Sequence, residues 1–84
     1  MTTLDLSGLK CPLPVLKTAK ALRGMAKGAE LTVIASDPMA EIDMAHFCAE
    51  AGHHLLSVKR DGETLVFRIR RGEGRPAASA KGAD

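Results

Sequence analysis

The sequence predicts an α+β domain: a two-layer sandwich of order β-α-β-α-β-β, with a four-stranded mixed sheet and two helices on one of its faces. Three observations predict this architecture. A β-rich run, L-T-V-I-A-S at residues 31–36, lies between two segments whose apolar residues recur at helical spacing. A strong two-residue hairpin turn, Asp61-Gly62, follows them. The 84 residues are enough for one domain.

A short strand and a first helix open the predicted domain. Residues 3–6 alternate, so Leu4 and Leu6 share one face of the strand. Gly8 lies in the loop that follows, where glycine adopts backbone conformations that other residues avoid. The first helix is predicted from about Pro12 to Met25, with one apolar stripe made of Pro12, Val15, Leu16, Ala19 and Leu22.

The next elements are a central strand and a second helix. Residues 31–36 form the strand, which should lie parallel to the first because a helix connects them. Asp37-Pro38 resembles a helix cap with proline at the first helical position. This helix is predicted to extend to about Ala51 and to end at Gly52. The residues predicted to face inward are Ala40, Met44, Phe47, Cys48 and Ala51.

The hairpin supplies two antiparallel strands, residues 55–60 and 63–70, predicted to form the edges of the sheet. A turn centred on Asp61-Gly62 pairs Val58 with Leu65, and Leu56 with Phe67. These are apolar pairs on one face, which favours this register. The other face is expected to meet water or a partner and carries Lys59, Thr64, Arg68 and Arg70.

Composition narrows the class of protein. A net charge of +2 is too small to indicate nucleic-acid binding by itself, and no run of about 18 apolar residues predicts a membrane span. The first residues do not resemble a signal peptide, so we expect a cytoplasmic protein whose thiols stay reduced. Residues 1–72 form the predicted domain. Residues 73–84 lack periodicity and are predicted to be a disordered C-terminal tail.

The segment Cys11-Pro12-Leu13-Pro14 carries the strongest functional pattern. Proline is tolerated in the first turn of a helix, where backbone N–H groups have no partner. Cys11 would then lie as the capping residue at the positive end of the helix, which favours thiolate over thiol and predicts a lowered pKa. The alternative is a packed, unreactive cysteine, because free cysteine is often buried.

Neighbouring residues are predicted to support this sulfur site. Lys10 adds positive potential, and the two prolines leave mainly the N–H groups of Leu13 and Val15 to hold the sulfur. Asp5 either accepts N–H bonds from the Ser7-Gly8 turn or orients the loop. Gly8 is expected to be a backbone requirement of the same loop.

Other candidate groups admit two interpretations. Cys48 lies on the apolar side of the second helix, which favours a packed thiol over a resolving cysteine. Arg70 and Arg71 fit either partner docking or an ordinary charged strand edge. No metal site is expected, because the spacing of His46, Cys48 and the His53-His54 pair matches no usual zinc pattern.

The segment from Leu4 to Pro14 resembles the signature of the TusA/SirA-like sulfur-carrier family, in which Asp, Gly and then Cys-Pro-x-Pro follow at this spacing. Ser36-Asp37-Pro38, Phe47-Cys48 and the closing run at 69–72 are also similar to that family. The resemblance covers residues 3–72.

The resemblance implies a small β-α-β-α-β-β domain that carries sulfur as a persulfide on Cys11. It implies a cysteine desulfurase or rhodanese-type protein as donor, and an acceptor in tRNA 2-thiouridine synthesis or in sulfur oxidation. The resemblance implies no cofactor besides this covalent persulfide. We expect a monomeric sulfurtransferase component that acts with partners rather than as a stand-alone enzyme, and that binds neither membrane nor nucleic acid directly.

Two alternatives remain open from the sequence. One is a regulatory or nucleic-acid-binding module that uses the basic strand face and no sulfur chemistry, although that face lacks aromatic residues to stack on bases. The other is a thiol-disulfide redox protein that pairs Cys11 with Cys48, which requires Cα atoms about 4.4–6.8 Å apart.

Overall fold

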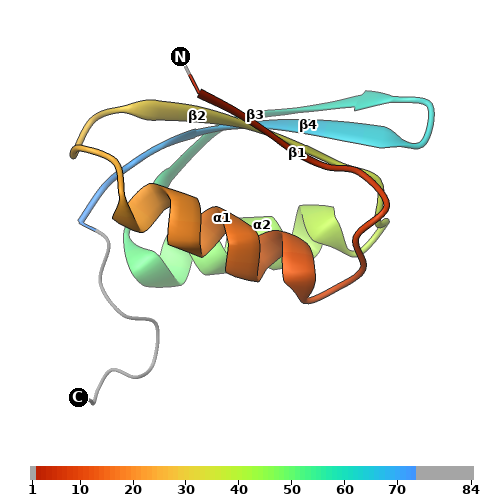
Figure 1. Ribbon diagram of the computed structural model, residues 1–84, viewed down its shortest axis with the longest axis horizontal. Helices are drawn as coiled ribbons and strands as arrows, with labels where there is room; N and C mark the ends of the chain where they lie inside the picture. The colour runs from red at the N-terminus through yellow and green to blue at the C-terminus, as the bar shows by residue number, and fades with distance from the viewer. Residues whose placement is uncertain (1, 74–84) are drawn as a thin grey trace.

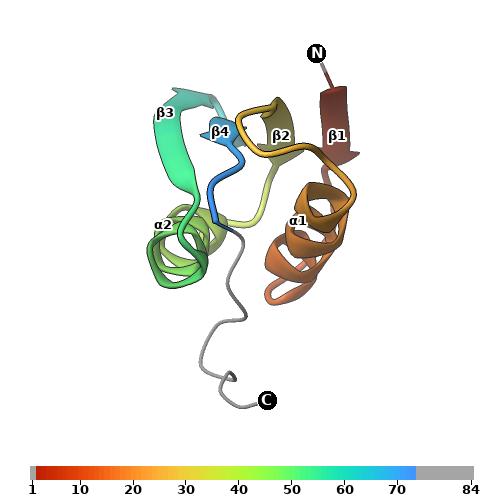
Figure 2. The same ribbon diagram turned by 90° about the vertical axis from the view of Figure 1, so that its left-hand side faces the viewer.

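The structure, a computed structural model, describes residues 2–73 and has two layers, a sheet and a pair of helices (Figure 1). Its elements along the chain are β1 (Thr2–Leu6), α1 (Leu13–Arg23), β2 (Glu30–Ala35), α2 (Ala40–Ala51), β3 (His54–Asp61) and β4 (Thr64–Arg70). Viewed nearly along the helix axes, α1 and α2 lie side by side beneath the same face of the sheet (Figure 2). The predicted fold class and element order are confirmed.

The sheet has the strand order β1-β2-β4-β3. β1 pairs in parallel with β2, as the helical crossover requires, and the other two pairings are antiparallel. The hairpin was predicted to supply two edge strands, but only β3 lies at an edge. β4 pairs with β2 and is interior, because its alternate residues Leu65, Phe67 and Ile69 are all buried.

The register of the hairpin differs from the prediction by two residues. Val58 pairs with Phe67 rather than Leu65, and Asp61 pairs with Thr64. The turn is therefore Gly62-Glu63, and Gly62 takes its first position with a φ of 62°, a left-handed conformation that glycine adopts at no steric cost. A shift of two residues preserves the faces of both strands, so the predicted inward and outward sets are largely unchanged.

An irregularity in β3 corrects one further assignment. The register shifts between Leu55 and Ser57, which leaves Leu56 as an extra residue between two paired ones. Leu55 then packs against the core, and Leu56, predicted to face inward, is 39% exposed.

The core lies between the helices and the sheet. Its buried members come from every strand except β3 and from both helices: Leu6, Leu22, Leu31, Val33, Ala35, Ala40, Met44, Cys48, Leu65, Phe67 and Ile69. Within residues 2–73, neither helix is long and apolar enough to cross a bilayer.

The apolar stripe predicted for α1 is only partly the face that the core buries. The buried residues of this helix are Pro14, Thr18 and Leu22, which recur every four positions. Leu16 is 57% exposed. Val15 and Ala19 are half-buried and line the groove between the two helices, and Val15 also packs against the core. The apolar residues of α1 thus serve two surfaces, and only one of them is the core.

Hydrogen bonds connect the residues that follow β4 to the end of α2. Gly52 terminates α2, as predicted. It takes a left-handed conformation, and its carbonyl accepts the N–H of Glu73 at 3.1 Å. The N–H of Gly72 donates to Nδ1 of the buried His53 at 3.0 Å. Burial and the nearby Arg71 lower the pKa of His53, so the ring stays neutral and can accept this bond. The predicted tail was residues 73–84: Glu73 is described and bonded to Gly52, and residues 74–84 lie outside the described residues.

Gly72→Ala should lower the free energy of unfolding by at least about 3 kcal/mol. A Cβ at this position would meet the carbonyl oxygen of Gly52 at 1.7 Å, and a backbone atom cannot move aside as a flexible side chain can. Gly24→Ala is the matched control, because its Cβ would have an ordinary contact of 3.7 Å. Urea denaturation followed by circular dichroism measures both. Equal stability of the two variants would contradict the close approach.

Thr18→Val should raise the free energy of unfolding by about 1 kcal/mol. Among the described residues the Thr18 hydroxyl is buried and has no hydrogen-bond partner, so valine of similar shape removes an uncompensated polar group. The same denaturation assay tests this. A loss of stability of similar size would show that the hydroxyl is paired in solution.

Candidate functional site

The site begins with the loop that joins β1 to α1. Asp5 accepts hydrogen bonds from the backbone N–H and the hydroxyl of Ser7, at 3.0 and 2.6 Å, and these bonds lower the pKa of its carboxyl. Gly8, at a φ of 85°, donates its N–H to the hydroxyl of Ser36 at 2.8 Å. Asp5 therefore stabilises the turn through these two hydrogen bonds from Ser7. The loop as a whole is tied to the end of β2.

The start of α1 lies one residue later than predicted. Pro12 occupies the capping position and follows a cis peptide bond, Leu13 is the first helical residue, and the buried Pro14 fits within the first turn. The N–H of Leu13 donates to the carbonyl of Lys10 at 2.8 Å rather than to the sulfur. Cys11 is thus not the helix cap, and its exposed thiol stands one residue before it.

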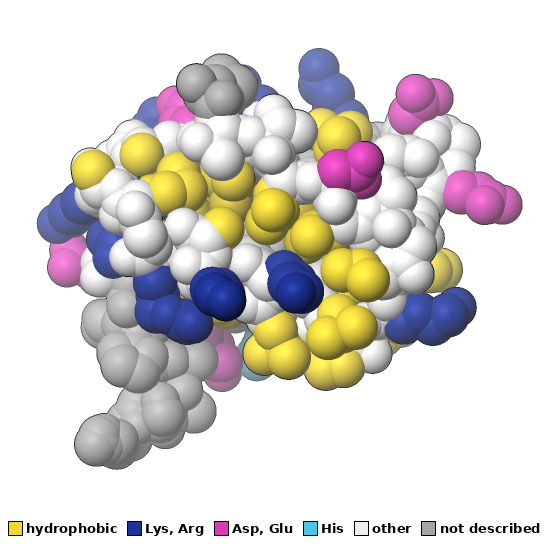
Figure 3. All heavy atoms as spheres, in the orientation of Figure 1, with side chains coloured by type: hydrophobic (Ala, Val, Ile, Leu, Met, Phe, Trp, Pro, Cys, Tyr) yellow, Lys and Arg dark blue, Asp and Glu magenta, His cyan; other side chains and the backbone are white. Residues whose placement is uncertain are grey.

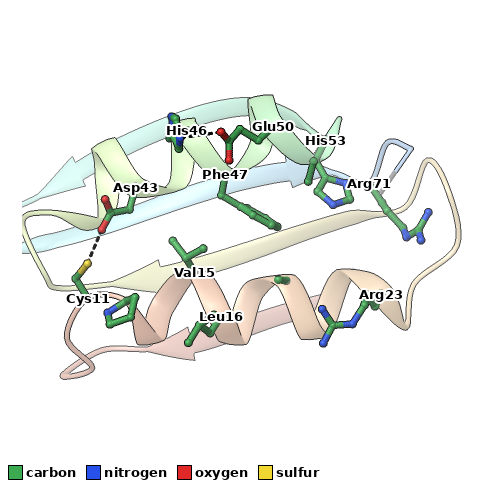
Figure 4. A pocket seen from close by; sticks show the side chains of 13 residues that line it. Cys11, Val15, Leu16, Arg23, Asp43, His46, Phe47, Glu50, His53 and Arg71 are labelled. Carbon is green, nitrogen blue, oxygen red and sulfur yellow. Dashed lines mark hydrogen bonds and ion pairs between the residues drawn. The ribbon is translucent and has the colours of Figure 1, made fainter. Parts of the chain in front are cut away.

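A carboxylate, rather than the helix N-terminus, determines the direction in which the pKa of the Cys11 thiol is shifted. The thiol donates a hydrogen bond to Oδ2 of Asp43 in the first turn of α2, with Sγ and Oδ2 2.7 Å apart (Figure 4). This bond is the main cause of a raised pKa of Cys11, and burial and the negative charges of Asp43 and Asp37 add to it. The predicted lowering of this pKa is wrong. The negative charge of Asp43 disfavours the Cys11 thiolate more than the N-terminus of α1, which begins later than predicted, favours it.

Asp37 holds the backbone of the site. Its carboxylate accepts the N–H of Cys11 and, at 3.0 Å, the N–H of Met39. These two bonds and the charge of Lys10 lower the pKa of Asp37, so it remains ionised. Asp37-Pro38 was expected to cap α2 directly. The structure places Met39 at the cap and Asp37 two residues earlier, where one carboxylate joins the start of α2 to the cysteine loop.

A groove of about 520 Å³ runs between the two helices away from the thiol (Figure 4). Cys11 and Asp43 lie at one end, and Arg23, His53 and Arg71 lie at the other. Its middle is mainly apolar, with Val15, Leu16 and Ala19 from α1 and Phe47 from α2. The groove therefore explains where the exposed part of the α1 stripe points.

Exposed apolar side chains lie at the start of both helices, close in the chain to Cys11 and Asp43. Four of the five large hydrophobic residues that are exposed in the described chain lie in the first two turns of the helices or just before them: Leu13, Leu16, Met39 and Ile42. We call these four residues the apolar rim. Hydrophobic atoms gather over the beginning of α1 in the space-filling view (Figure 3). An exposed apolar cluster beside a reactive group is typical of a protein docking surface.

Comparison with known proteins decides the family. The family described as "Sulfurtransferase TusA" matches residues 2–71, which include every helix and strand of the fold. The chain belongs to this family.

Relatives of the TusA family share its size and sequence. Sulfur carrier protein TusA of Pseudomonas entomophila is 42% identical over 69 residues, covering 82% of this chain and 86% of the relative. Sulfur carrier protein TusA of Allochromatium vinosum is 41% identical over 68 residues, covering 81% and 90%. A relative from Aquifex aeolicus is 47% identical over 66 residues, and the match spans only 34% of that longer protein.

A solved structure supports the fold. The crystal structure of a SirA-like protein from Desulfitobacterium hafniense superposes with a TM-score of 0.75 at 26% identity and covers 87% of this chain and 100% of that one. This agrees with the four-stranded mixed sheet and the two helices described above.

The second cysteine of this TusA-family chain is a core residue. Cys48 is 2% exposed, and burial raises its pKa from an ordinary value of 9.0 to about 11. It lies five residues beyond Asp43 on α2, about 7.5 Å further along the helix axis, and packs against the sheet. Both cysteines are free. The packed interpretation is confirmed, and this placement argues against a disulfide partnership with Cys11.

The two arginines at the end of β4 make contacts within the domain. Arg71 donates from Nε to the carbonyl of Leu22 at 2.7 Å, which satisfies an acceptor in the last turn of α1. Arg70 pairs with Glu30 at 3.6 Å on the open face of the sheet, and Arg68 pairs with the same glutamate. The structure thus joins neither Arg70 nor Arg71 to the thiol, although Arg71 borders the far end of the groove.

The histidines show no metal-binding arrangement. Within residues 2–73, no group of three or more His, Cys, Asp or Glu side chains is placed to hold a metal ion. His46 instead pairs with Glu50 one turn along α2, at 3.1 Å.

Sequence reasoning missed Asp43, the group that touches the thiol. The topology could have indicated it. Parallel strands have their carboxyl ends on the same side of the sheet, and α1 and α2 follow the carboxyl ends of β1 and β2. Acidic residues in the first turn of α2 must therefore lie near the start of α1. Helical spacing alone predicted only which residues of α2 turn inward, and Asp43 is not among them.

Asp43→Asn should shift the pH profile of Cys11 alkylation to lower pH. The amide has no charge and cannot disfavour the thiolate as the carboxylate does, so the thiol ionises earlier. Iodoacetamide labelling at a series of pH values, read by the mass of the Cys11 peptide, gives the midpoint. Glu41→Gln, a carboxylate on the same helix that pairs with Arg60, is the control. An unchanged midpoint in Asp43→Asn would exclude control by this carboxylate.

Proposed function

We propose that Cys11 carries sulfane sulfur as a persulfide, received from a cysteine desulfurase or a rhodanese-type protein and passed to an acceptor protein. One observation carries this proposal: in a chain of the TusA family, the only cysteine of the described residues exposed to a partner is Cys11. The buried Cys48 offers no route for sulfur.

Loading transfers one sulfur atom without net oxidation. The Cys11 thiolate attacks the outer sulfur of the donor persulfide, a bond forms between Sγ and that sulfur, and the sulfur–sulfur bond of the donor breaks. The donor leaves as a thiolate and takes up a proton. The products are the Cys11 persulfide and the donor thiol.

Discharge reverses these roles. A thiolate of the acceptor attacks the outer sulfur of the Cys11 persulfide, the bond to Sγ breaks, and Cys11 leaves as a thiolate that takes up a proton. Carriage between the two proteins requires that the persulfide be exposed, and the position of Cys11 before the helix rather than within it meets that requirement.

The remaining predicted site residues support Cys11 in this proposal. Pro12 and Pro14 start a stiff helix beside the sulfur, and Asp5 and Gly8 shape the loop that precedes it. Lys10 acts on the sulfur indirectly, by stabilising the charge of Asp37 that holds the Cys11 backbone.

The partners dock on the apolar rim, which contains Leu13. Its residues lie close in the chain to Cys11 and Asp43, and this surface would be covered when a donor or acceptor places its own cysteine next to Sγ. The acceptor belongs either to tRNA 2-thiouridine synthesis or to dissimilatory sulfur metabolism. A cytoplasmic location, where thiols stay reduced, suits both.

A regulatory or nucleic-acid-binding function has weaker support. The basic face of the sheet, on which it depends, is partly neutralised because Glu30 pairs with both Arg68 and Arg70. Loss of two free cations weakens the attraction for phosphates.

Incubation with a cysteine desulfurase and cysteine should add one sulfur, about 32 Da, to the intact mass of the protein. The addition should be reversed by a reductant, be absent in Cys11→Ser and persist in Cys48→Ser. A rhodanese with thiosulfate is the second donor to be used. Failure of both donors to load wild-type protein would overturn the carrier proposal.

A further inference from the structure

The acceptor of the Cys11 proton is already in place. Oδ2 of Asp43 lies 2.7 Å from Sγ and comes from α2, 32 residues away in sequence. A carboxylate in direct hydrogen-bond contact with a nucleophile has the geometry of a general base.

Other charged groups near the thiol are engaged or unsuited. The carboxylate of Asp37 accepts two backbone N–H groups, from Cys11 and Met39, and its lowered pKa makes it a poor proton acceptor. His46, one turn along α2 from Asp43, is paired with Glu50. Lys10 carries only donors. Asp43 is the group in contact with Sγ that can take a proton.

Docking makes a local acceptor necessary. In the free protein Cys11 is exposed and can lose its proton to water. A protein partner that covers the apolar rim excludes water from the surroundings of Cys11, because the rim residues have no polar side-chain groups to which water could bind. The proton must then move to a group inside the interface.

We propose that Asp43 is a catalytic residue of sulfur transfer, which takes the Cys11 proton and passes it to the donor during loading, and delivers the proton of the acceptor thiol to Cys11 during discharge. This inference rests on the proposed carrier function. In loading, the proton moves from Sγ to Asp43 as Sγ bonds to the outer sulfur of the donor persulfide, and it then neutralises the departing donor thiolate. In discharge, Asp43 takes the proton of the acceptor thiol as its sulfur bonds to the outer sulfur of the persulfide, and delivers that proton to Sγ as the bond between Sγ and the outer sulfur breaks.

The same contact restrains the resting protein. Cys11 stays a thiol to higher pH than a free cysteine, because Asp43 disfavours its thiolate. Small electrophiles and oxidants in water attack the thiolate, so they react slowly with the carrier when no partner is bound. Asp43 therefore opposes reaction with small reagents and promotes reaction with docked proteins.

These opposite effects give a decisive experiment on the full chain. The initial rate of sulfur loading from a cysteine desulfurase with cysteine, by intact mass, is measured together with the rate of iodoacetamide labelling at neutral pH. Asp43→Asn should load about 100-fold more slowly and be labelled faster. Asp43→Glu should recover most of the loading, and Glu41→Gln should match wild type in both assays. Thermal unfolding checks that each variant is folded.

The outcomes separate this inference from the carrier function itself. If wild-type protein does not load from either donor, the carrier function fails. If wild type loads and Asp43→Asn loads at least as fast, Asp43 acts only on the thiolate fraction and the proposal is overturned. If Asp43→Asn is slower in both assays and Asp43→Glu gives no recovery, the carboxylate maintains the geometry of the site alone, which also overturns it.

Discussion

The parallel pairing of β1 with β2 is the constraint on which the rest of the molecule depends. It requires the chain between the strands to cross over as α1, and because β3 runs parallel to β2 on the far side of β4, the chain after β2 crosses over as α2 beneath the same face (Figure 2). Both helices consequently start at one edge of the sheet. The cysteine loop before α1 and the acidic first turn of α2 meet there, and a thiol that would otherwise stand alone in solvent gains a carboxylate partner.

That partner changes how the cysteine works. A thiol activated by a helix terminus would be a thiolate at rest, open to any electrophile. A thiol bonded to Asp43 stays protonated to higher pH, and a thiolate of higher pKa is intrinsically the stronger nucleophile once formed. A carrier that must hold reactive sulfur between two encounters gains more from such control than from constant reactivity.

The apolar residues of the helix layer are divided between folding and docking. Pro14 and Leu22 face the sheet and complete the core, whereas Leu16 and Val15 face the groove between the helices. A core of this size cannot bury every apolar residue of an amphipathic helix, because only two layers are present. The unburied part remains next to the thiol, which is where a binding surface is required.

The sequence by itself determined the fold class, the element order and the packed Cys48, because periodicity and turn residues are local properties. Only the tertiary structure decided the hairpin register, the interior position of β4 and the raised pKa of Cys11. The register depends on which residue of the turn takes the left-handed conformation. The pKa depends on Asp43, 32 residues away along the chain, whose distance from Sγ no local pattern encodes.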